Sequence, residues 1–339
     1  MRKLIINSLL SAGLAILFLA GVKPLQAHAD NVIVCIDPGH GGEDQGASYS
    51  GYDEKDLDFK IATAMYEELS QYEGITVYMT RYGDDTLSLK QRAQIAAGYG
   101  AEFLYSIHIN ACDDHKMFGS EVWISAYGNH YAKGRSFGEI AENELESTVG
   151  VYSKGVKTKL SGNGKQDYYG IIRHARSNGV TGCIIEHCYM DNDHDIGYAF
   201  NDDILVQMGK ADATSVAKYY GLKSTTLGKD YSGYKRAVYE APKAPVRQDD
   251  TPPEYVNIEL MEYNAAESTA KLHVWGKDSQ TKIIYYNYSS DGGATWSPLH
   301  GWTAETEGYL TIPVSGPDVV IALYNRYCGG TESNHVILY

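Results

Sequence analysis

Short apolar runs alternate with amphipathic stretches over residues 32–221, and this alternation limits that part of the chain to a layered α/β fold. Several runs are apolar on both faces, which is typical of strands in a sheet covered by helices on each side. The predicted strands span residues 32–36, 75–79, 103–109, 121–124 and 182–185. The predicted helices span residues 53–70, 88–97, 131–146 and 202–220. We therefore expect an α/β fold with a mostly parallel or mixed central sheet and helices on both faces.

The alternation stops after Gly221, where the composition changes. Residues 222–253 are polar and contain four prolines, which indicates a linker rather than a regular core. Residues 254–339 then carry alternating runs rich in Tyr and Val, at 271–275, 283–288 and 319–324. These runs predict a small all-β sandwich of immunoglobulin-like or fibronectin-like type. We expect one domain over residues 30–221, a linker over 222–253 and a β-domain over 254–339.

The first 29 residues have the pattern of a secretory signal peptide. Two basic residues precede an apolar run over residues 4–22, and residues 27–29 form an A-x-A cleavage site. The apolar run also approaches the roughly 20 residues that span a bilayer, so an uncleaved membrane anchor is the alternative. We expect cleavage after Ala29 and export of the protein.

The charge balance is acidic, with 43 Asp and Glu against 29 Lys and Arg and a net charge of −14. Removal of residues 1–29 takes away three basic residues and changes the net charge to −17, from 26 basic and 43 acidic residues. Such a surface repels polyanions, so no nucleic acid partner is expected. The five cysteines are odd in number and thinly spread, unlike the disulfide framework of a small secreted domain.

Two histidines are expected at the carboxyl edge of the sheet, where open α/β sheets bind ligands. His40 follows the first strand in the run Asp-Pro-Gly-His-Gly-Gly, in which Pro and Gly force a turn. His108 ends a nearly uncharged strand, and a period of two puts Ser106, His108 and Asn110 on one face. Read singly, His40 is an ordinary loop residue and His108 a hydrogen-bonded core histidine.

Two glutamates are expected near the same edge. Glu54 begins a predicted helix and shares the inward face of Leu57 and Ile61, although a first-turn glutamate can also act only on the helix dipole. Glu186 follows a buried strand, where a carboxylate needs a charge or a metal nearby. Two imidazoles and one carboxylate are a ligand set of catalytic zinc sites, and a further carboxylate can act as general base.

The combined motifs resemble a known family. In order, the chain carries Asp-Pro-Gly-His-Gly-Gly at 37–42, Glu54, Thr-Arg at 80–81, Arg92, Ser-Ile-His-Ile-Asn at 106–110, Lys-Gly-Val-Lys at 154–157 and Ile-Ile-Glu at 184–186. Together they resemble the zinc-dependent N-acetylmuramoyl-L-alanine amidases, the bacterial wall autolysins, over residues 32–220. The chain departs from the family pattern at Lys154, where Arg is common, and at residues 187–189.

The resemblance implies that His40, Glu54 and His108 bind one Zn²⁺ ion and that Glu186 is the catalytic glutamate. It implies hydrolysis of the amide bond between N-acetylmuramic acid and L-alanine in peptidoglycan, outside the cell or at the wall. Glu186 would take a proton from a zinc-activated water and deliver it to the L-alanine nitrogen. Two alternatives stay open: a zinc peptidase that cuts within the stem peptide, and a non-catalytic wall-binding protein on an amidase scaffold.

Other residues receive weaker predictions. Asn110 and Tyr169 are candidates for substrate binding. Tyr168 and Tyr169 are expected just before a strand, where they either border the groove or serve only in packing. A second metal site at His187, Cys188 and His194 is disfavoured, because His187 faces away from Glu186 if the strand continues. Arg81 and Arg92 are expected in structural ion pairs.

The predicted β-domain carries no residue pattern that decides its role. Residues 289–296 resemble an Asp-box hairpin turn, and the many tyrosines suit either a core or a glycan platform. Three roles stay open for this domain: contact with a wall glycan, contact with a protein, or only spacing of the catalytic unit. Between residues 120 and 169 no extra acidic helix is evident, so a built-in plug of the site is not expected there.

Overall fold

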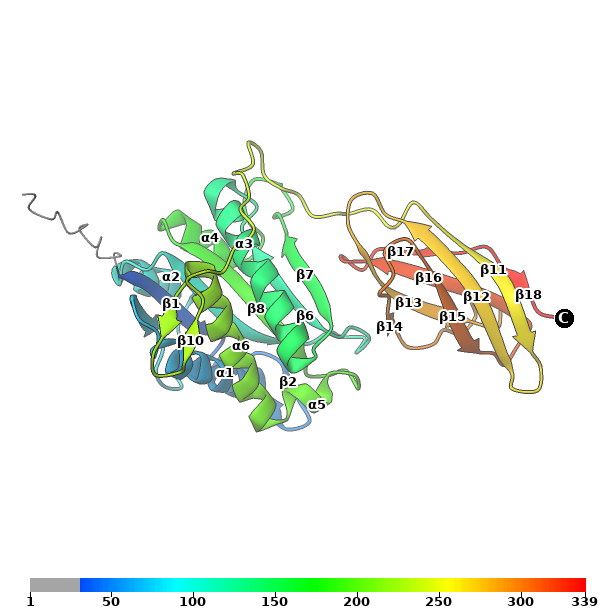
Figure 1. Ribbon diagram of the computed structural model, residues 1–339, viewed down its shortest axis with the longest axis horizontal. Coiled ribbons are helices and arrows are strands. Elements are labelled where there is room, and N and C mark those ends of the chain that lie inside the picture. Colours follow the sequence, from blue (N-terminus) through cyan, green and yellow to red (C-terminus); the bar gives the residue numbers. More distant parts are fainter. Residues whose placement is uncertain (1–30) are drawn as a thin grey trace, which may run out of the picture. The chain divides into compact units, whose positions relative to one another are not determined.

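A six-stranded mixed sheet organises the N-terminal part of the protein in a computed structural model that describes residues 31–339 (Figure 1). The strand order is β4-β1-β5-β8-β6-β7. Four neighbouring strands are parallel, β6 runs antiparallel to β8, and β7 runs parallel to β6. The strands are β1 (Val32–Pro38), β4 (Ile75–Met79), β5 (Phe103–Asn110), β6 (Ser120–Ile124), β7 (Ser153–Thr158) and β8 (Thr181–Tyr189). The expected signal peptide lies outside the described residues.

Helices cover both faces of this sheet, as the two-sided apolar runs predict. Alternate residues of one strand feed separate cores: Val34 and Ile36 belong to one core, and Cys35 belongs to the other. The first core is closed by α1 (Glu54–Leu69), α3 (Gly128–Glu144) and α6 (Asp202–Tyr220). The second is closed by α2 (Leu89–Gly98) and α4 (Gly170–Ser177). The α/β prediction is therefore confirmed.

Local sequence signals set the helix ends. Ser88 and Gln91 form a capping box at the start of α2, and Asn201 accepts hydrogen bonds from two backbone N–H groups at the start of α6. Gly221 ends α6 in the left-handed conformation, with φ at 67°. Each such cap stabilises a helix by about 1 kcal/mol.

Some elements differ from the sequence-based expectation. Tyr168 and Tyr169 precede helix α4 rather than a strand, because residues 170–177 form a short helix with Ile171, Ile172 and Ala175 on its buried face. Strand β7 was not predicted, since its two lysines hide the apolar pattern of a buried strand. A π-helical turn, Leu145–Val149, extends α3, and a short helix, α5 (Ile196–Ala199), precedes α6.

Two antiparallel sheets follow in the C-terminal part, as predicted for a β-sandwich. One has the order β11-β12-β15 and the other β14-β13-β16-β17, with β18 paired to β16. Their inward side chains share one core that includes Val256, Val274 and Leu323. The strands are β11 (Tyr255–Asn264), β12 (Thr269–Lys277), β13 (Ile283–Ser289), β14 (His300–Gly301), β15 (Glu307–Pro313), β16 (Asp318–Asn325), β17 (Gly330–Glu332) and β18 (Val336–Ile337).

The segment expected as a linker is partly ordered by regular structure. It begins with buried Leu222 and a small hairpin of β9 (Lys223–Ser224) and β10 (Lys229–Asp230). Ser224 donates a hydrogen bond to the Gln71 carbonyl, and Lys229 pairs with Glu68 of α1. These contacts fix the start of the segment against the α/β part. A second small hairpin, β2 (Ser48–Tyr49) and β3 (Tyr52–Asp53), leads into α1.

An aromatic cluster joins the α/β part to the C-terminal sheets within the compact unit of residues 31–339. Phe118, Ile284 and Tyr285 form its buried centre, and Tyr152 packs against them. The Tyr285 hydroxyl donates to the Phe118 carbonyl, and the Tyr152 hydroxyl contacts the carbonyls of Ile284 and Trp302. Tyr285 is fully buried, so this contact excludes water as a domain core does.

Residues 31–339 contain every cysteine of the chain. All five cysteines are free thiols, and Cys35, Cys183 and Cys188 are buried. No helix in this range is long and apolar enough to cross a membrane.

Candidate active site

The turn after β1 presents His40 where β5 and α1 come together. Backbone crowding explains the glycine that precedes it: a Cβ atom on Gly39 would lie 2.4 Å from both the Asp58 carboxylate and the His108 ring. His40 itself has a positive φ of 52°, a left-handed conformation that is uncommon for a residue with a side chain. The Pro-Gly-His run therefore bends the chain so that three elements can approach one point.

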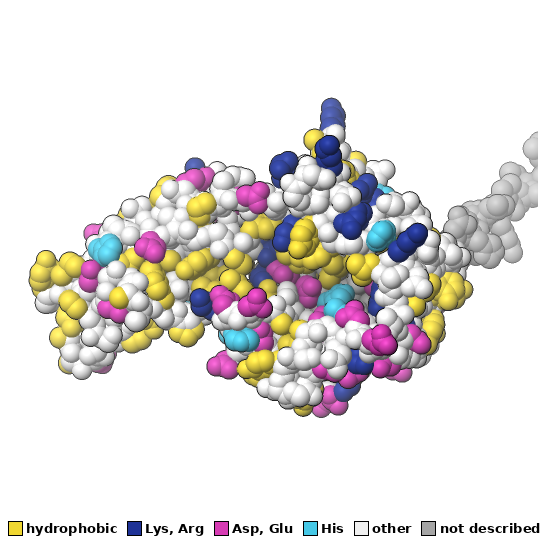
Figure 2. All heavy atoms as spheres, turned by 180° about the vertical axis from the view of Figure 1, so that it is seen from behind, with side chains coloured by type: hydrophobic (Ala, Val, Ile, Leu, Met, Phe, Trp, Pro, Cys, Tyr) yellow, Lys and Arg dark blue, Asp and Glu magenta, His cyan; other side chains and the backbone are white. Residues whose placement is uncertain are grey.

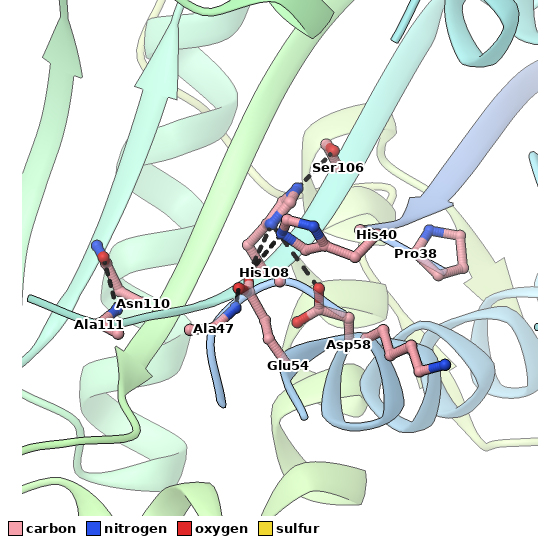
Figure 3. A network of polar contacts seen from close by, with 12 residues as sticks. Pro38, His40, Ala47, Glu54, Asp58, Ser106, His108, Asn110 and Ala111 are labelled. Atoms are coloured by element: carbon pink, nitrogen blue, oxygen red, sulfur yellow. Dashed lines mark hydrogen bonds and ion pairs between the residues drawn. The ribbon is translucent and has the colours of Figure 1, made fainter. Parts of the chain in front are cut away.

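Four side chains of metal-binding type converge on this point (Figure 3). Glu54 Oε1 lies 3.2 Å from His40 Nε2 and 2.9 Å from His108 Nδ1. Asp58, one turn further along α1, lies 3.7 Å from His108 Nδ1. The four potential ligand atoms all lie within 4.8 Å of one another, and no other such group was found within residues 31–339. The structure thus brings the three predicted ligands together and adds Asp58.

Hydrogen bonds behind the histidines fix which ring nitrogen faces the shared space. His40 Nδ1 lies 2.8 Å from Asp44, which leaves Nε2 toward Glu54. Ser106 donates its single proton to Asp37, at 2.8 Å. Its oxygen, 3.2 Å from His108 Nε2, therefore accepts from that nitrogen. When Nε2 carries the ring proton in this way, Nδ1 of His108 is left to bind a cation at the site, as outer partners of metal-binding histidines arrange.

Charge pairing holds the cluster together in the metal-free state. Burial opposes ionisation of Glu54, but hydrogen bonds and charges from both histidines lower its pKa from 4.5 to about 2. Burial likewise opposes protonation of His40, while Glu54 and Asp44 raise the pKa of His40 from 6.5 to about 9. A cation bound here replaces the imidazolium proton as the partner of Glu54.

Glu186 lies beside the cluster on the neighbouring strand. It is paired with His108 in the register of β5 and β8, and a pocket of about 320 Å³ is lined by both. Within the described residues its buried Oε2 has no hydrogen-bond partner. Burial, with the charges of Glu54 and Glu121, raises the pKa of Glu186 from 4.5 to about 7. A carboxyl group with a pKa near neutrality can both accept and donate a proton.

All six residues that the sequence suggested for the site line this one pocket. They are His40, Glu54, His108, Asn110, Tyr169 and Glu186. Figure 2 shows histidine and acidic side chains inside a hollow on this face, next to hydrophobic side chains. Tyr169 stands at the start of α4, with its ring 5.0 Å from that of Trp123. Asn110 donates to Glu121 and accepts from the Ala111 N–H, so both ends of its amide already have partners.

A buried ionic network borders Glu186 on its other side. Glu121 of β6 is paired in register with Glu186 and contacts the ammonium groups of Lys154 and Lys157 of β7. Burial opposes the charge of Glu121, but the two lysines lower its pKa from 4.5 to about 2. Lys154, where the chain differs from the family pattern, therefore belongs to this ionic network and not to the group of possible metal ligands.

His187, Arg92 and Arg81 contact groups other than the four clustered side chains. His187 faces away from Glu186 and is buried between Asp212, at 2.8 Å, and the His108 carbonyl, at 3.0 Å. Arg92 forms an ion pair with Asp37 at 2.9 Å. Arg81 forms no ion pair among the described residues and donates to backbone carbonyls instead, so this half of the ion-pair prediction is wrong.

Sequence reasoning missed four residues of the site. Asp58 carries a signal that could have identified it, because it lies four residues after Glu54 on the same helical face. Asp44, four residues after His40, lies in a loop and has no periodic signal. Asp37 and Ser106 stand inside motifs that were recognised, but their hydrogen bonds join separate strands.

Comparison with known proteins identifies the α/β part. The family model described as "N-acetylmuramoyl-L-alanine amidase" matches residues 34–218, more than half of the chain. The chain belongs to the N-acetylmuramoyl-L-alanine amidase family. It is a hydrolase of the peptidoglycan amidase class, and its possible metal-binding group agrees with a family that is generally metal-dependent.

Individual relatives agree with this assignment. N-acetylmuramoyl-L-alanine amidase CwlM of Bacillus licheniformis is 29% identical over 192 residues, 56% of this chain and 70% of that protein. The sporulation-specific amidase of Bacillus subtilis is 27% identical over 196 residues, 58% of this chain and 71% of that protein. The amidase structure from Clostridium difficile 630 has a TM-score of 0.50 and 26% identity, and covers 56% of this chain and 97% of its own. The matches therefore cover the α/β part of this amidase.

Proposed function

We propose that this amidase uses zinc to hydrolyse the amide bond between N-acetylmuramic acid and L-alanine, with His40, Glu54 and His108 as metal ligands. One observation carries the proposal. Two imidazole nitrogens and a carboxylate oxygen, fixed by Asp44 and Ser106 behind them, face one point in a pocket that also contains Glu186.

The donor set fits zinc. Two imidazoles and a carboxylate, with outer hydrogen bonds that select the ring nitrogens, are a known arrangement of catalytic zinc sites. A zinc ion held there supplies a Lewis acid that activates water and polarises the amide carbonyl.

Glu186 is the residue on which proton transfer depends in this proposal. Its Oε2 has no partner among residues 31–339 and is free to accept the proton of the attacking water. The same carboxyl then delivers the proton to the L-alanine nitrogen as the amide bond breaks, so that a neutral amine leaves. Burial raises the pKa of Glu186 above the usual value of a carboxyl group and toward neutrality, which suits both steps.

The pocket wall supports a role in substrate binding for Tyr169 more than for Asn110. Tyr169 lines the pocket, whereas the Asn110 amide is held by Glu121 and Ala111. In this arrangement Tyr169 offers an apolar surface to the substrate, and Asn110 shapes the wall.

We further propose the organisation of the whole chain: a signal peptide over residues 1–29, the catalytic domain over 30–221, a linker over 222–253 and an accessory β-domain over 254–339. Export places the enzyme where peptidoglycan lies. The strongly acidic composition means that attachment to the wall, through a glycan or a protein, depends on specific contacts of the β-domain rather than on bulk charge.

Digestion of purified peptidoglycan, read by mass spectrometry, tests the proposal. The wild type should release intact stem peptides and leave free lactyl groups on the glycan. Glu186→Ala should retain zinc and lose turnover by roughly 10²–10⁴-fold, while Glu67→Ala, an exposed glutamate on α1, should match the wild type. Cuts within the stem peptide would favour the peptidase alternative. A wild-type protein that binds no zinc and stays inert when zinc is added would favour the wall-binding alternative.

A further inference from the structure

Asp58 is a fully buried carboxylate with no assigned task. It lies on α1 four residues after Glu54, and this spacing puts both carboxylates on the same helical face, one turn apart. Figure 3 shows the two side chains beneath the histidine rings. The same i, i+4 spacing on a helix is used by zinc enzymes to direct two ligands at one ion.

Among the described residues, the surroundings of Asp58 offer its carboxyl group no side-chain hydrogen-bond partner. Within residues 31–339 neither of its oxygens has a hydrogen-bond partner. The neighbouring Arg81 could pair with it, but Arg81 directs its Nε and both terminal nitrogens to backbone carbonyls. An isolated buried carboxylate is strongly unfavourable, so Asp58 lacks the positive partner that its position requires.

The position of Asp58 relative to His108 excludes the role of an outer carboxylate, which orients a metal-binding histidine without touching the metal. Such a carboxylate accepts a hydrogen bond from the ring nitrogen that does not bind the ion. That nitrogen, Nε2 of His108, is already held by Ser106 on the far side of the ring. Asp58 instead lies 3.7 Å from Nδ1, on the side where Glu54 lies 2.9 Å from the same atom.

We propose that Asp58 is a fourth protein ligand of the metal, binding through Oδ2, so that the water of the proposed function would enter as a fifth ligand. The inference rests on the metal site of the proposed function and extends it. Two carboxylates and two neutral imidazoles balance the charge of a divalent cation, whereas His40, Glu54 and His108 alone leave one positive charge. The buried carboxylate of Asp58 thereby gains the positive partner that the protein does not supply.

Zinc binding by purified metal-free protein tests this, with no substrate present. Asp58→Asn keeps the shape of the side chain and removes its charge, and Asp56→Asn, exposed on the same helix, is the matched control. Competition with a chromophoric chelator should show zinc affinity reduced about 100-fold or more in Asp58→Asn and unchanged in Asp56→Asn. Asp58→Ser replaces Asp58→Asn if the latter does not fold.

Thermal unfolding separates a ligand from a structural residue. For a ligand, Asp58→Asn should have a metal-free Tm close to that of the wild type, because the side chain keeps its shape and loses no hydrogen bond, and a much smaller rise of Tm on adding zinc. A lower metal-free Tm together with zinc affinity within threefold of the wild type would overturn the proposal. The absorption spectrum of the Co²⁺-loaded protein gives a second readout, which should change in Asp58→Asn, and an unchanged spectrum contradicts direct ligation.

These outcomes are distinct from those of the peptidoglycan digestion. If the wild type binds zinc through Asp58 but cuts a different bond, the proposed substrate fails and the ligand assignment stands. If Asp58→Asn binds zinc as the wild type does while the wild type releases stem peptides, the ligand assignment fails and the amidase function stands.

Discussion

Glu121 offers the sharpest test of how charge is balanced beneath the active site. Replacing it as Glu121→Gln keeps the shape of the side chain and leaves two ammonium groups, those of Lys154 and Lys157, buried without their carboxylate. The amide can still accept hydrogen bonds from Asn110 and Trp123 through its oxygen, so the change is confined to the oxygen that binds the two lysines.

The expected loss follows from the pKa of Glu121. A fall from 4.5 to about 2 on folding corresponds to about 3 kcal/mol of stability, at roughly 1.4 kcal/mol per pKa unit. Removing one partner of a buried ion pair typically lowers the free energy of unfolding by about 3–5 kcal/mol, which agrees. Because the folded-state pKa lies below the unfolded value, this contribution is present above pH 4.5 and is lost as pH falls toward 2.

Urea unfolding of the metal-free protein measures the effect. At pH 7 Glu121→Gln should be less stable than the wild type by about 3 kcal/mol, and the difference should narrow as pH is lowered from 4.5 toward 3. The exposed Glu67→Gln should change stability by less than about 0.5 kcal/mol. A Glu121→Gln protein as stable as Glu67→Gln at pH 7, or a difference that does not shrink in acid, would refute the reasoning.

Two further predictions concern the chemistry of the site. Because Glu186 accepts a proton in its ionised form and burial raises its pKa above the usual 4.5, kcat/KM should fall on the acid side as Glu186 is protonated, measured with a soluble muropeptide from pH 5 to 9; a kcat/KM that stays constant down to pH 5 would mean that the pKa of Glu186 is not raised in the working enzyme. Asp44→Ala removes the partner that orients His40 and should weaken zinc binding by about 10–100-fold in chelator competition. The metal-free Tm should change little, because Asp44 is exposed. A zinc affinity equal to that of the wild type would show that the loop alone fixes the His40 ring.

Sequence-based prediction of the fold was most accurate for helices and strands whose apolar residues repeat regularly along their whole length. Helix α6 was expected over residues 202–220 and occupies those residues, because its cap and its apolar face agree. Strand β7 was missed because Lys154 and Lys157 are buried by pairing with Glu121, which lies on another strand. A strand that is stabilised by a long-range ion pair carries no local apolar pattern, so its sequence is that of a loop.

The sequence could predict those site residues whose direction is set by the single helix or strand on which they lie. Glu54 faces inward because of its place on α1, and His108 reaches the sheet edge because of its place on β5. Their separation of 2.9 Å depends on the packing of α1 against the sheet, which no local pattern encodes. The hydrogen bond from Ser106 to Asp37 crosses between strands in the same way, so the tautomer of His108 required the structure.

The buried hydroxyl of Tyr285 has a consequence for how such proteins evolve. A module held only by a linker can be exchanged for another without changing the enzyme that carries it. Here the Tyr285 hydroxyl and the ring of Phe118 occupy one water-free contact, and Tyr152 completes it with bonds to the carbonyls of Ile284 in β13 and Trp302 just after β14. A replacement module would have to supply a matching ring and carbonyls, so the two parts are expected to be inherited together.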